Sequence, residues 1–348
     1  MRLSALGDLV FCTSLLEGLR RAYPDAHIAW LAQSGFADVL RDDPRLSELI
    51  AVPKDTLKSP TALWRLRREL RARRFDWVID AQGLAKSRVL AWLAGGTRRV
   101  GFRSKEPLAF LLHEQVDKGG DAADIASEYR YLAERLTGAP AAAPRLPIAT
   151  VAAERIAQAM PGLGLAAGFV ALCPFTTRPQ KHWPDAHWPE LARRLSDAGL
   201  GPCVVFGGPG DRAHAEQLVA QMPAGSVNLA GRTALPDLAA WLAQARVVVG
   251  VDTGLTHIGI ATQTPTVALF GSTCPYTRGA ESPLRVLYDG LPCAPCKRHP
   301  TCNGAFTCMR QLTPERVVDA AQALVGAAHG RDSASHRGHG PLLQDTRR

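Results

Sequence analysis

The sequence has no long hydrophobic run. No apolar stretch reaches the roughly 18 residues that a membrane-spanning helix needs. The first residues also lack the charged segment and apolar segment that direct secretion. We therefore expect a cytosolic protein. Its 348 residues suffice for two domains with separate cores, and the mean hydropathy of −0.05 is typical of a globular chain.

Several motifs of well-known enzyme classes are also missing. No G-x-G-x-x-G follows a first strand, and no Walker A motif is present, which disfavours a nicotinamide dehydrogenase and a P-loop NTPase. The chain contains no G-x-S-x-G, the turn that carries the nucleophile of α/β-hydrolases. Any enzymatic activity must therefore depend on other motifs.

Basic residues outnumber acidic ones. The 41 Lys and Arg residues against 32 Asp and Glu give a net charge of +9. An excess of this size indicates a polyanionic partner, such as nucleic acid, an anionic membrane or a phosphorylated substrate. A genome that favours arginine codons is the alternative explanation. No nucleic-acid recognition motif is visible, so we do not expect nucleic acid as the partner.

Strand-like runs alternate with helical patterns along the whole chain, which predicts an α/β fold with doubly wound parallel sheets. In the first half we expect strands at residues 27–32, 48–52, 76–80 and 98–102, and helices at 9–22, 60–73, 85–94 and 121–136. In the second half we expect strands at 169–173, 202–206, 227–229, 247–249, 266–270 and 285–287, and helices at 187–197, 212–221, 235–244, 253–262 and 314–325.

The segment 138–147 contains three prolines and no periodicity, and we interpret it as a linker between domains. It predicts two Rossmann-like domains, at residues 1–145 and 146–328, that face each other across a cleft. Ligands of open α/β sheets bind beyond the carboxyl ends of the strands, on the side where such a cleft would lie. Residues 329–348 are polar and charged, and we expect a disordered tail there.

The stretch 246–262 has the pattern of a strand, a glycine-bearing turn and a helix. Three consecutive valines suit a strand buried on both faces, and Gly250, Asp252 and Gly254 then interrupt the run. Free amides and the dipole at the start of the following helix would favour a phosphate. Asp252 is expected to cap this helix and His257 to lie near its first turn. Taken alone, the stretch also fits a plain strand-to-helix turn.

Two further strand ends carry residues suited to a nucleotide. Thr176, Thr177 and Lys181 follow the strand expected at 169–173, where hydroxyls and an ammonium group suit a diphosphate. A surface loop that happens to be basic is the alternative. Asp211 follows three glycines after the strand expected at 202–206 and is placed to reach a ribose hydroxyl, although ordinary turns have the same composition.

Asp8 follows a glycine near the start of the chain and directly precedes an expected helix. Its carboxylate is suited to act as a general base on a hydroxyl, and a helix-capping role is the alternative. The segment 58–74 is rich in arginine, with Arg65 and Arg68 among the six. It predicts a helix that binds an anionic acceptor or lipid headgroups, or else an ordinary solvated surface helix.

Four cysteines cluster near the C-terminus, at Cys293, Cys296, Cys302 and Cys308. The number of thiols suits zinc, but their spacing is not that of a common zinc knuckle. A structural metal site and a reduced packing cluster both remain open, with zinc the less favoured. We expect a structural role for these cysteines.

Four segments together resemble the bacterial lipopolysaccharide heptosyltransferases of glycosyltransferase family 9. They are Ser4–Asp8, Asp80–Ser87, Thr176-Thr177 with Lys181–Pro184, and Asp252–His257. The resemblance implies a GT-B fold and an inverting, metal-independent transfer from ADP-heptose without a cofactor. It implies an acceptor that is Kdo or heptose of the inner core, at the cytoplasmic face of the inner membrane, with peripheral contact to anionic lipid.

The resemblance also implies roles for individual residues. Asp8, in an acceptor-binding N-terminal domain, would be the catalytic base. The substrate-binding residues in the C-terminal domain would be Thr176, Thr177, Lys181, Asp211, Asp252, Thr253, Gly254 and His257. Acceptor contacts would come from Arg65, Arg68 and Lys86. A sugar-nucleotide epimerase of the same fold and a non-catalytic sugar-nucleotide-binding protein are the alternatives.

Two features bear on the branch of the family. Asp80–Leu84 and Lys105–Leu108 resemble the heptosyltransferase I branch, whereas the cysteine cluster followed by Met309 resembles the heptosyltransferase II branch. The family normally has an apolar strand before the Ser-x-x-Gly-Asp motif, and here only Met1-Arg-Leu precedes it. Either the start is assigned too late or the first strand is missing. A missing central strand would leave its neighbours unpaired.

Overall fold

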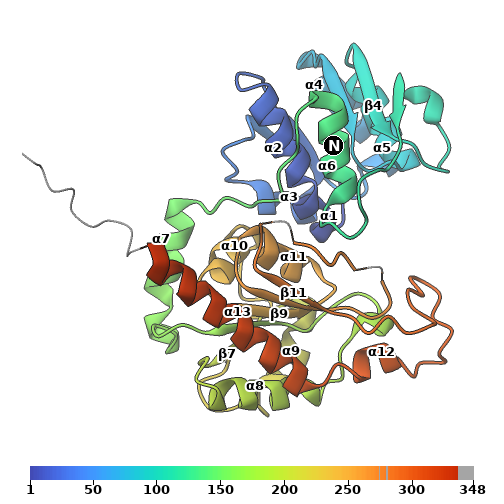
Figure 1. Cartoon of the computed structure of the whole chain (residues 1–348). Coiled ribbons are helices and arrows are strands. Elements are labelled where there is room, and N and C mark those ends of the chain that lie inside the picture. Colours follow the sequence, from blue (N-terminus) through green and yellow to red (C-terminus); the bar gives the residue numbers. More distant parts are fainter. Residues whose placement is uncertain (274, 280, 336–348) are drawn as a thin grey trace, which may run out of the picture.

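The computed structural model describes residues 1–273, 275–279 and 281–335. The chain folds into two α/β bodies, an N-terminal one with strands β1–β5 and a C-terminal one with β6–β11 (Figure 1). Every strand pair in both bodies is parallel, as the alternation of strands and helices predicts. In the described part of the chain, no helix is long and apolar enough to cross a membrane.

The C-terminal body is built on one six-stranded sheet with the order β11-β10-β9-β6-β7-β8. Its strands are β6 (Val170–Cys173), β7 (Cys203–Val205), β8 (Val227–Asn228), β9 (Val247–Val251), β10 (Thr266–Leu269) and β11 (Leu284–Leu287). Its helices are α7 (Thr150–Ala159), α8 (His187–Asp197), α9 (Arg212–Val219), α10 (Leu235–Ala243), α11 (Gly254–Ala261), α12 (Thr307–Arg310) and α13 (Pro314–Ser335).

Strand β9 lies inside this sheet, between β6 and β10, and all of its residues are buried. Val248 packs in the core shared with α10 and α11, whereas Val247 and Val249 pack with α8 and α13 on the opposite face. The continuous valine run is therefore explained by burial on both faces, as the sequence predicts.

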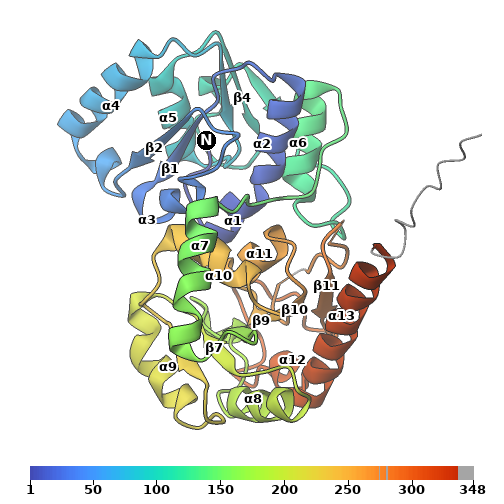
Figure 2. The ribbon, with the colours of Figure 1, turned by 90° about the vertical axis from the view of Figure 1, so that its left-hand side faces the viewer.

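The N-terminal body contains two separate parallel sheets. Strand β1 (Ala29–Gln33) pairs with β2 (Glu48–Val52), and β4 (Arg98–Phe102) pairs with β3 (Trp77–Asp80) and β5 (Glu114–Val116). The helices are α1 (Leu6–Phe11), α2 (Thr13–Ala22), α3 (Ser34–Ala37), α4 (Pro60–Ala72), α5 (Ala85–Ala94) and α6 (Ser127–Thr137). Figure 2 shows α2 beside α6 on one side of these strands and α4 with α5 on the other.

Residues 1–3 lie between β1 and β3. The Met1 ammonium group donates to the carbonyl of Ile79 (2.6 Å), and the Met1 carbonyl accepts from the amide of Ala81 (3.0 Å). On the other side, the Leu3 carbonyl accepts from the amide of Gln33 (3.0 Å). Beside these residues lies a hollow of about 500 Å³ lined mainly by apolar side chains from both sheets. In the described structure β1 and β3 do not pair with each other, because residues 1–3 lie between them and bond to both sides.

The two bodies meet where α1 packs against α11. Gly7 is required at this contact, because a Cβ atom there would lie 2.3 Å from Cδ2 of His257. The linker between the two bodies is bonded to each of them. The amide of Arg145 donates to the Thr13 hydroxyl (3.1 Å), and the amide of Leu146 donates to the carbonyl of Ala261 (3.0 Å).

Some predicted elements differ from the structure. The helix expected at 9–22 is two helices, α1 and α2, because the hydroxyls of Thr13 and Ser14 bond back to the carbonyls of Val10 and Phe11 near Cys12. Helix α7 and the short strand β5 were not predicted. Helix α13 continues to Ser335, so the predicted start of the disordered tail at residue 329 is wrong. Residues 336–348 of that tail lie outside the described residues.

We expect a buried ion cluster around Arg45 to be important for stability. The Arg45 guanidinium group bonds to both carboxylate oxygens of Asp43 (2.9 and 2.6 Å), to Glu17 (2.9 Å) and to the carbonyl of Arg145 (2.7 Å). Arg45→Met would leave the buried Asp43 carboxylate without its counter-ion. The free energy of unfolding should fall by about 3–5 kcal/mol, measured by urea denaturation. Arg41→Met, which removes an exposed pair with Asp38, should unfold at the wild-type midpoint.

Candidate active site

Asp252, at the carboxyl end of β9, is the centre of a group of polar side chains. Its Oδ2 atom lies 2.5 Å from Nζ of Lys181 and accepts from the hydroxyl of Thr273 (2.9 Å). Its Oδ1 atom lies 3.4 Å from Nε2 of His257. The Asp252 side chain is only 14% exposed. Burial alone would raise the pKa of this carboxyl, but His257 and Lys181 outweigh burial and hold the pKa well below its usual range.

Asp252 does not cap the following helix, so that part of the prediction is wrong. The residue at the N-cap of α11 is Thr253, and no side chain bonds to the free amides of the first turn from this position. The Asp252 carboxylate is instead turned toward Lys181 and Thr273. The first turn of α11 therefore presents backbone donors beside a lysine, an arrangement that suits an anion.

Lys181 is held in place by its neighbours in the loop after β6. The ring of His182 bonds through Nε2 to the carbonyl of Thr176 (2.9 Å), and the buried Trp183 donates from Nε1 to the carbonyl of Leu312 (2.7 Å). On the other side of the loop, the side-chain amide of Gln180 donates to the backbone carbonyl of Lys297 (2.9 Å). His182 and Trp183 thus anchor the loop, and Lys181 is left to face Asp252.

The two threonines of the same loop have different surroundings. The Thr176 hydroxyl donates to the backbone carbonyl of Asp252 (3.3 Å), which links the ends of β6 and β9. Thr177 is exposed. These strands are neighbours in the sheet, so the structure brings together Thr176, Lys181, Asp252 and His257 as the sequence predicts.

Asp211 acts mainly in its own turn. Its Oδ2 atom accepts from the amide of Gly208 (2.8 Å), at the start of the short helix that leads into α9. This is a capping arrangement, in which the side chain satisfies a free amide at the start of the short helix. Among the described residues, no hydrogen bond or ion pair joins Asp211 to Asp252, Lys181 or His257.

Asp8 lies in the first turn of α1, the helix that touches the C-terminal body. Its carboxylate pairs with the guanidinium group of the buried Arg2 and accepts from the amide of Ala5 (3.2 Å). The side chain is still 43% exposed, so one face is open to solvent. Its neighbour Gly7 packs on the ring of His257, which places the N-terminal motif beside the C-terminal one.

The three residues predicted to bind the acceptor do not lie together, unlike the group around Asp252. Arg65 and Arg68 are exposed on α4, where Arg68 stacks over the ring of Trp64 (5.0 Å). Both ribbon views place α4 at the side of the N-terminal body that is remote from the C-terminal body. Lys86 is exposed in the first turn of α5, at the carboxyl end of β3.

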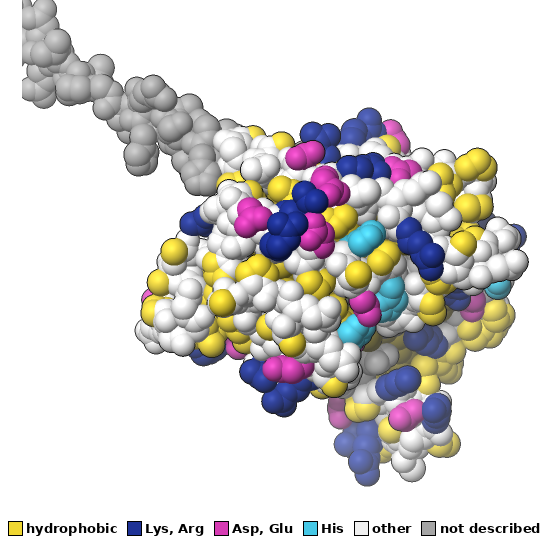
Figure 3. All heavy atoms as spheres, turned by 90° about the horizontal axis from the view of Figure 1, so that it is seen from below, with side chains coloured by type: hydrophobic (Ala, Val, Ile, Leu, Met, Phe, Trp, Pro, Cys, Tyr) yellow, Lys and Arg dark blue, Asp and Glu magenta, His cyan; other side chains and the backbone are white. Residues whose placement is uncertain are grey.

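Positive charge is not gathered on the underside of the C-terminal body. On the face shown in Figure 3, Lys and Arg side chains are interspersed with Asp and Glu. Elsewhere in the C-terminal body, Arg194 pairs with Glu190 (2.6 Å) and Arg316 with Asp289 (2.7 Å), so these arginines are already neutralised. This face therefore offers no continuous basic surface to an anionic partner.

The Asp80–Ser87 motif builds the turn after β3. The buried Asp80 accepts from the amide of Gln82 (3.0 Å) and from the Ser87 hydroxyl (2.9 Å). Arg88, which the sequence did not single out, is fully buried and donates to the Pro107 carbonyl (2.8 Å) and the Ser104 hydroxyl (2.9 Å). Together these bonds hold the loop after β3 and the loop after β4 in place beside Lys86.

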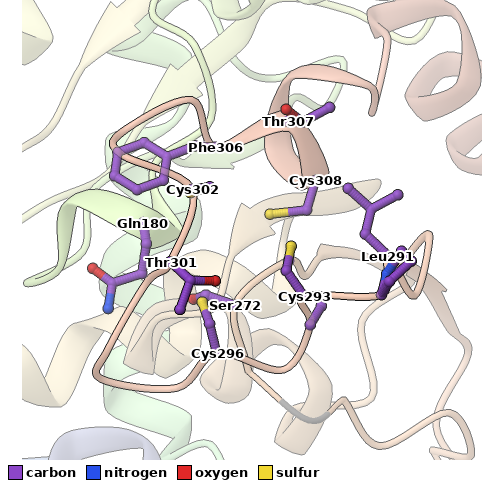
Figure 4. Close-up of a pocket in the computed structure, with 13 residues that line it drawn as sticks. Gln180, Ser272, Leu291, Cys293, Cys296, Thr301, Cys302, Phe306, Thr307 and Cys308 are labelled. Carbon is purple, nitrogen blue, oxygen red and sulfur yellow. The ribbon is translucent and has the colours of Figure 1, made fainter.

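The four clustered cysteines line a hollow of about 290 Å³, with Cys293 and Cys308 directed into the same space (Figure 4). Among residues 1–273, 275–279 and 281–335, no three His, Cys, Asp or Glu side chains are grouped so that they could hold a metal ion. Burial raises the pKa of Cys296 and Cys308, which favours the neutral thiols. The arrangement does not fit a zinc site, and we assign no metal to it.

Comparisons with known proteins identify the family of the chain. The sequence matches the family described as glycosyltransferase family 9 (heptosyltransferase) over residues 63–306. It is 31% identical to lipopolysaccharide heptosyltransferase 1 of Pseudomonas aeruginosa, covering 93% of this chain and 97% of that protein. It is 28% identical to lipopolysaccharide heptosyltransferase 2 of Salmonella typhimurium, covering 92% and 96%.

Solved structures give the same result. The E. coli heptosyltransferase WaaC with ADP-2-deoxy-2-fluoro heptose superposes with a TM-score of 0.70 at 26% identity, covering 94% of this chain and all of that one. A family 9 glycosyltransferase from Veillonella parvula gives a TM-score of 0.83 at 24% identity, covering 93% and 95%, and supports the fold alone. The two Rossmann-like bodies are thus those of the predicted GT-B fold. On the family match and the 31% identity to a relative over nearly its whole length, this chain belongs to glycosyltransferase family 9 and is a heptosyltransferase.

Proposed function

We propose that the chain transfers heptose from ADP-heptose to Kdo of the lipopolysaccharide inner core, with inversion at the anomeric carbon. The ion pair between Lys181 and Asp252, beside a first turn of α11 that has no side-chain cap, is the observation that carries this proposal. The name of the Pseudomonas relative, a heptosyltransferase 1, supports Kdo as the acceptor. So do the motifs at Asp80–Leu84 and Lys105–Leu108.

The donor diphosphate would bind between Lys181 and the start of α11. The ammonium group and the amides of Thr253 and Gly254 would donate to its oxygens, with Thr176 and Thr177 lining the loop opposite. Negative charge accumulates on the diphosphate as the bond to heptose breaks. Preorganised donors stabilise that charge without having to rearrange. Asp252 and His257 hold Lys181 and the turn in position, and Asp211 is assigned to the ribose.

Asp8 would accept the proton of the acceptor hydroxyl as it attacks the anomeric carbon from the face opposite the diphosphate. One base suffices for an inverting displacement, because no covalent sugar intermediate forms. Its exposed face gives the acceptor access, and Arg2 and the amide of Ala5 fix its position. The α1–α11 contact keeps this carboxylate near the donor residues.

The acceptor is anionic, and we assign Arg65, Arg68 and Lys86 to it. Lys86 lies at the carboxyl end of β3, where it would meet the Kdo carboxylate or a phosphate. The arginines on α4 would lie against the anionic headgroups that surround the lipid anchor of the acceptor. This arrangement corresponds to a peripheral protein on the cytoplasmic face of the inner membrane.

Incubation with ADP-heptose and a panel of lipid A acceptors tests the reaction. We expect mass spectrometry to show one added heptose on Kdo-lipid A and none on lipid A without Kdo. Addition only to acceptors that already carry heptose would assign the chain to the second transfer step. Isomerisation of the donor without any acceptor would instead identify an epimerase.

Asp8→Asn tests the base. The amide oxygen can still accept from Ala5, but it cannot take a proton, so kcat should fall about a hundredfold or more. ADP affinity, measured by calorimetry, should change little. Asp117→Asn, at an exposed position of the same body, is the matched control. A near-normal rate would remove Asp8 as the base.

Lys181→Ala tests the diphosphate site. Loss of a charge-assisted contact should weaken ADP binding about tenfold or more and slow transfer. Calorimetric titration with ADP measures the first effect, and Lys54→Ala is a control for removal of an exposed lysine in the other body. Unchanged ADP affinity would move the phosphate site elsewhere.

A further inference from the structure

Tyr276, in the segment after β10, is a buried tyrosine next to the proposed donor site. Its hydroxyl lies 2.9 Å from Nδ1 of His257, and only 8% of the residue is exposed. Burial, reinforced by the negative charge of Asp252, raises the pKa of Tyr276 well above its ordinary value. The hydroxyl therefore stays protonated and can serve as a hydrogen-bond donor.

The partners of His257 fix the direction of the hydrogen bonds. Nε2 faces Oδ1 of Asp252, and an ionised carboxylate can only accept, so Nε2 carries a hydrogen. In the neutral imidazole the other nitrogen, Nδ1, is then an acceptor. It is the tyrosine hydroxyl that donates to this nitrogen. Tyr276 thus supports the tautomer that points its N–H group at Asp252, because it supplies the donor that Nδ1 needs.

The chain of contacts continues to the lysine. Asp252 holds Lys181 through Oδ2 and faces His257 through Oδ1, so the position of the carboxylate depends on both neighbours. We propose that Tyr276 is a positioning residue that orients Lys181 toward the donor diphosphate through His257 and Asp252. This inference rests on the proposed function, because it assumes that Lys181 binds that diphosphate.

The ring of Tyr276 has a separate packing role. It meets Phe270 (centroids 5.5 Å apart) and Phe11 of the N-terminal body (5.4 Å), and Phe11 also lies against His257 (4.5 Å). Phenylalanine at position 276 would keep these ring contacts and lose only the hydroxyl. Tyr276→Phe therefore separates the hydrogen bond from the packing.

Calorimetric titrations with ADP and with adenosine test the proposal. Tyr276→Phe should weaken ADP binding about three- to tenfold, the loss expected for one buried hydrogen bond. It should leave adenosine affinity unchanged, because adenosine has no phosphate for Lys181. In a Lys181→Ala background, Tyr276→Phe should cause no further loss of ADP affinity. Tyr129→Phe removes a buried hydroxyl in the other body for which the described residues offer no hydrogen-bond partner. It is the matched control and should bind ADP as wild type does.

Three results would overturn the proposal. These are wild-type ADP affinity in Tyr276→Phe, an equal loss for ADP and adenosine, and an unchanged loss in the Lys181→Ala background. Thermal unfolding of each variant shows whether the fold is intact. The double variant is compared with Lys181→Ala alone, so any destabilisation caused by the loss of Lys181 is present in both proteins. If the wild-type protein does not bind ADP, the proposed function fails. If it binds ADP but one of the three results is found, only the role of Tyr276 fails.

Discussion

The buried carboxylate of Asp252 is the constraint around which the C-terminal site is arranged. A carboxylate that is mostly removed from water must be paired and hydrogen-bonded, or it destabilises the fold. Lys181, Thr273 and His257 meet that requirement from three different segments of the chain. The ends of neighbouring strands are therefore joined by charge as well as by the sheet. In the function proposed above, the lysine that neutralises Asp252 also binds the diphosphate, so one ion pair would have both a structural and a binding role.

The C-terminal fold could be predicted well from the sequence, because strands buried on both faces have continuous apolar runs, as at Val247–Val251. The N-terminal body was less accessible. The strand Glu114–Val116 is too short and polar to show a period. The break at Cys12 depends on the hydroxyls of Thr13 and Ser14, which bond to backbone carbonyls of the preceding turn, and such residues disfavour a helix interior only weakly. Helix Thr150–Ala159 has an amphipathic pattern, but it directly follows the proline-rich segment 138–147 and was not recognised as a separate helix.

The polar residues of the site were predictable because they follow strand ends, where parallel sheets place their ligands. Lys181, Asp252 and His257 were predicted in this way, and the structure brings them into one group. The capping role expected for Asp252 was wrong. The sequence pattern indicates a partner in the next few residues, whereas the carboxylate binds Lys181 and Thr273, which are distant along the chain. Tyr276 and Arg88 have no local signal at all. Their roles follow from burial and from partners that only the folded chain brings near.

The contact between the two bodies links the network around Asp252 to helix α1 of the N-terminal body. Gly7 and Phe11 both rest on His257, so the ring that faces Asp252 is also the surface on which α1 is seated. A side chain at position 7 would push α1 away from the ring and carry Asp8 with it. Any movement that separates the bodies must likewise expose the His257 ring and release its contact with Phe11. The position of Asp8, the proposed base, and the orientation of Lys181, the proposed donor-binding lysine, therefore depend on the same histidine, although the two residues belong to different bodies.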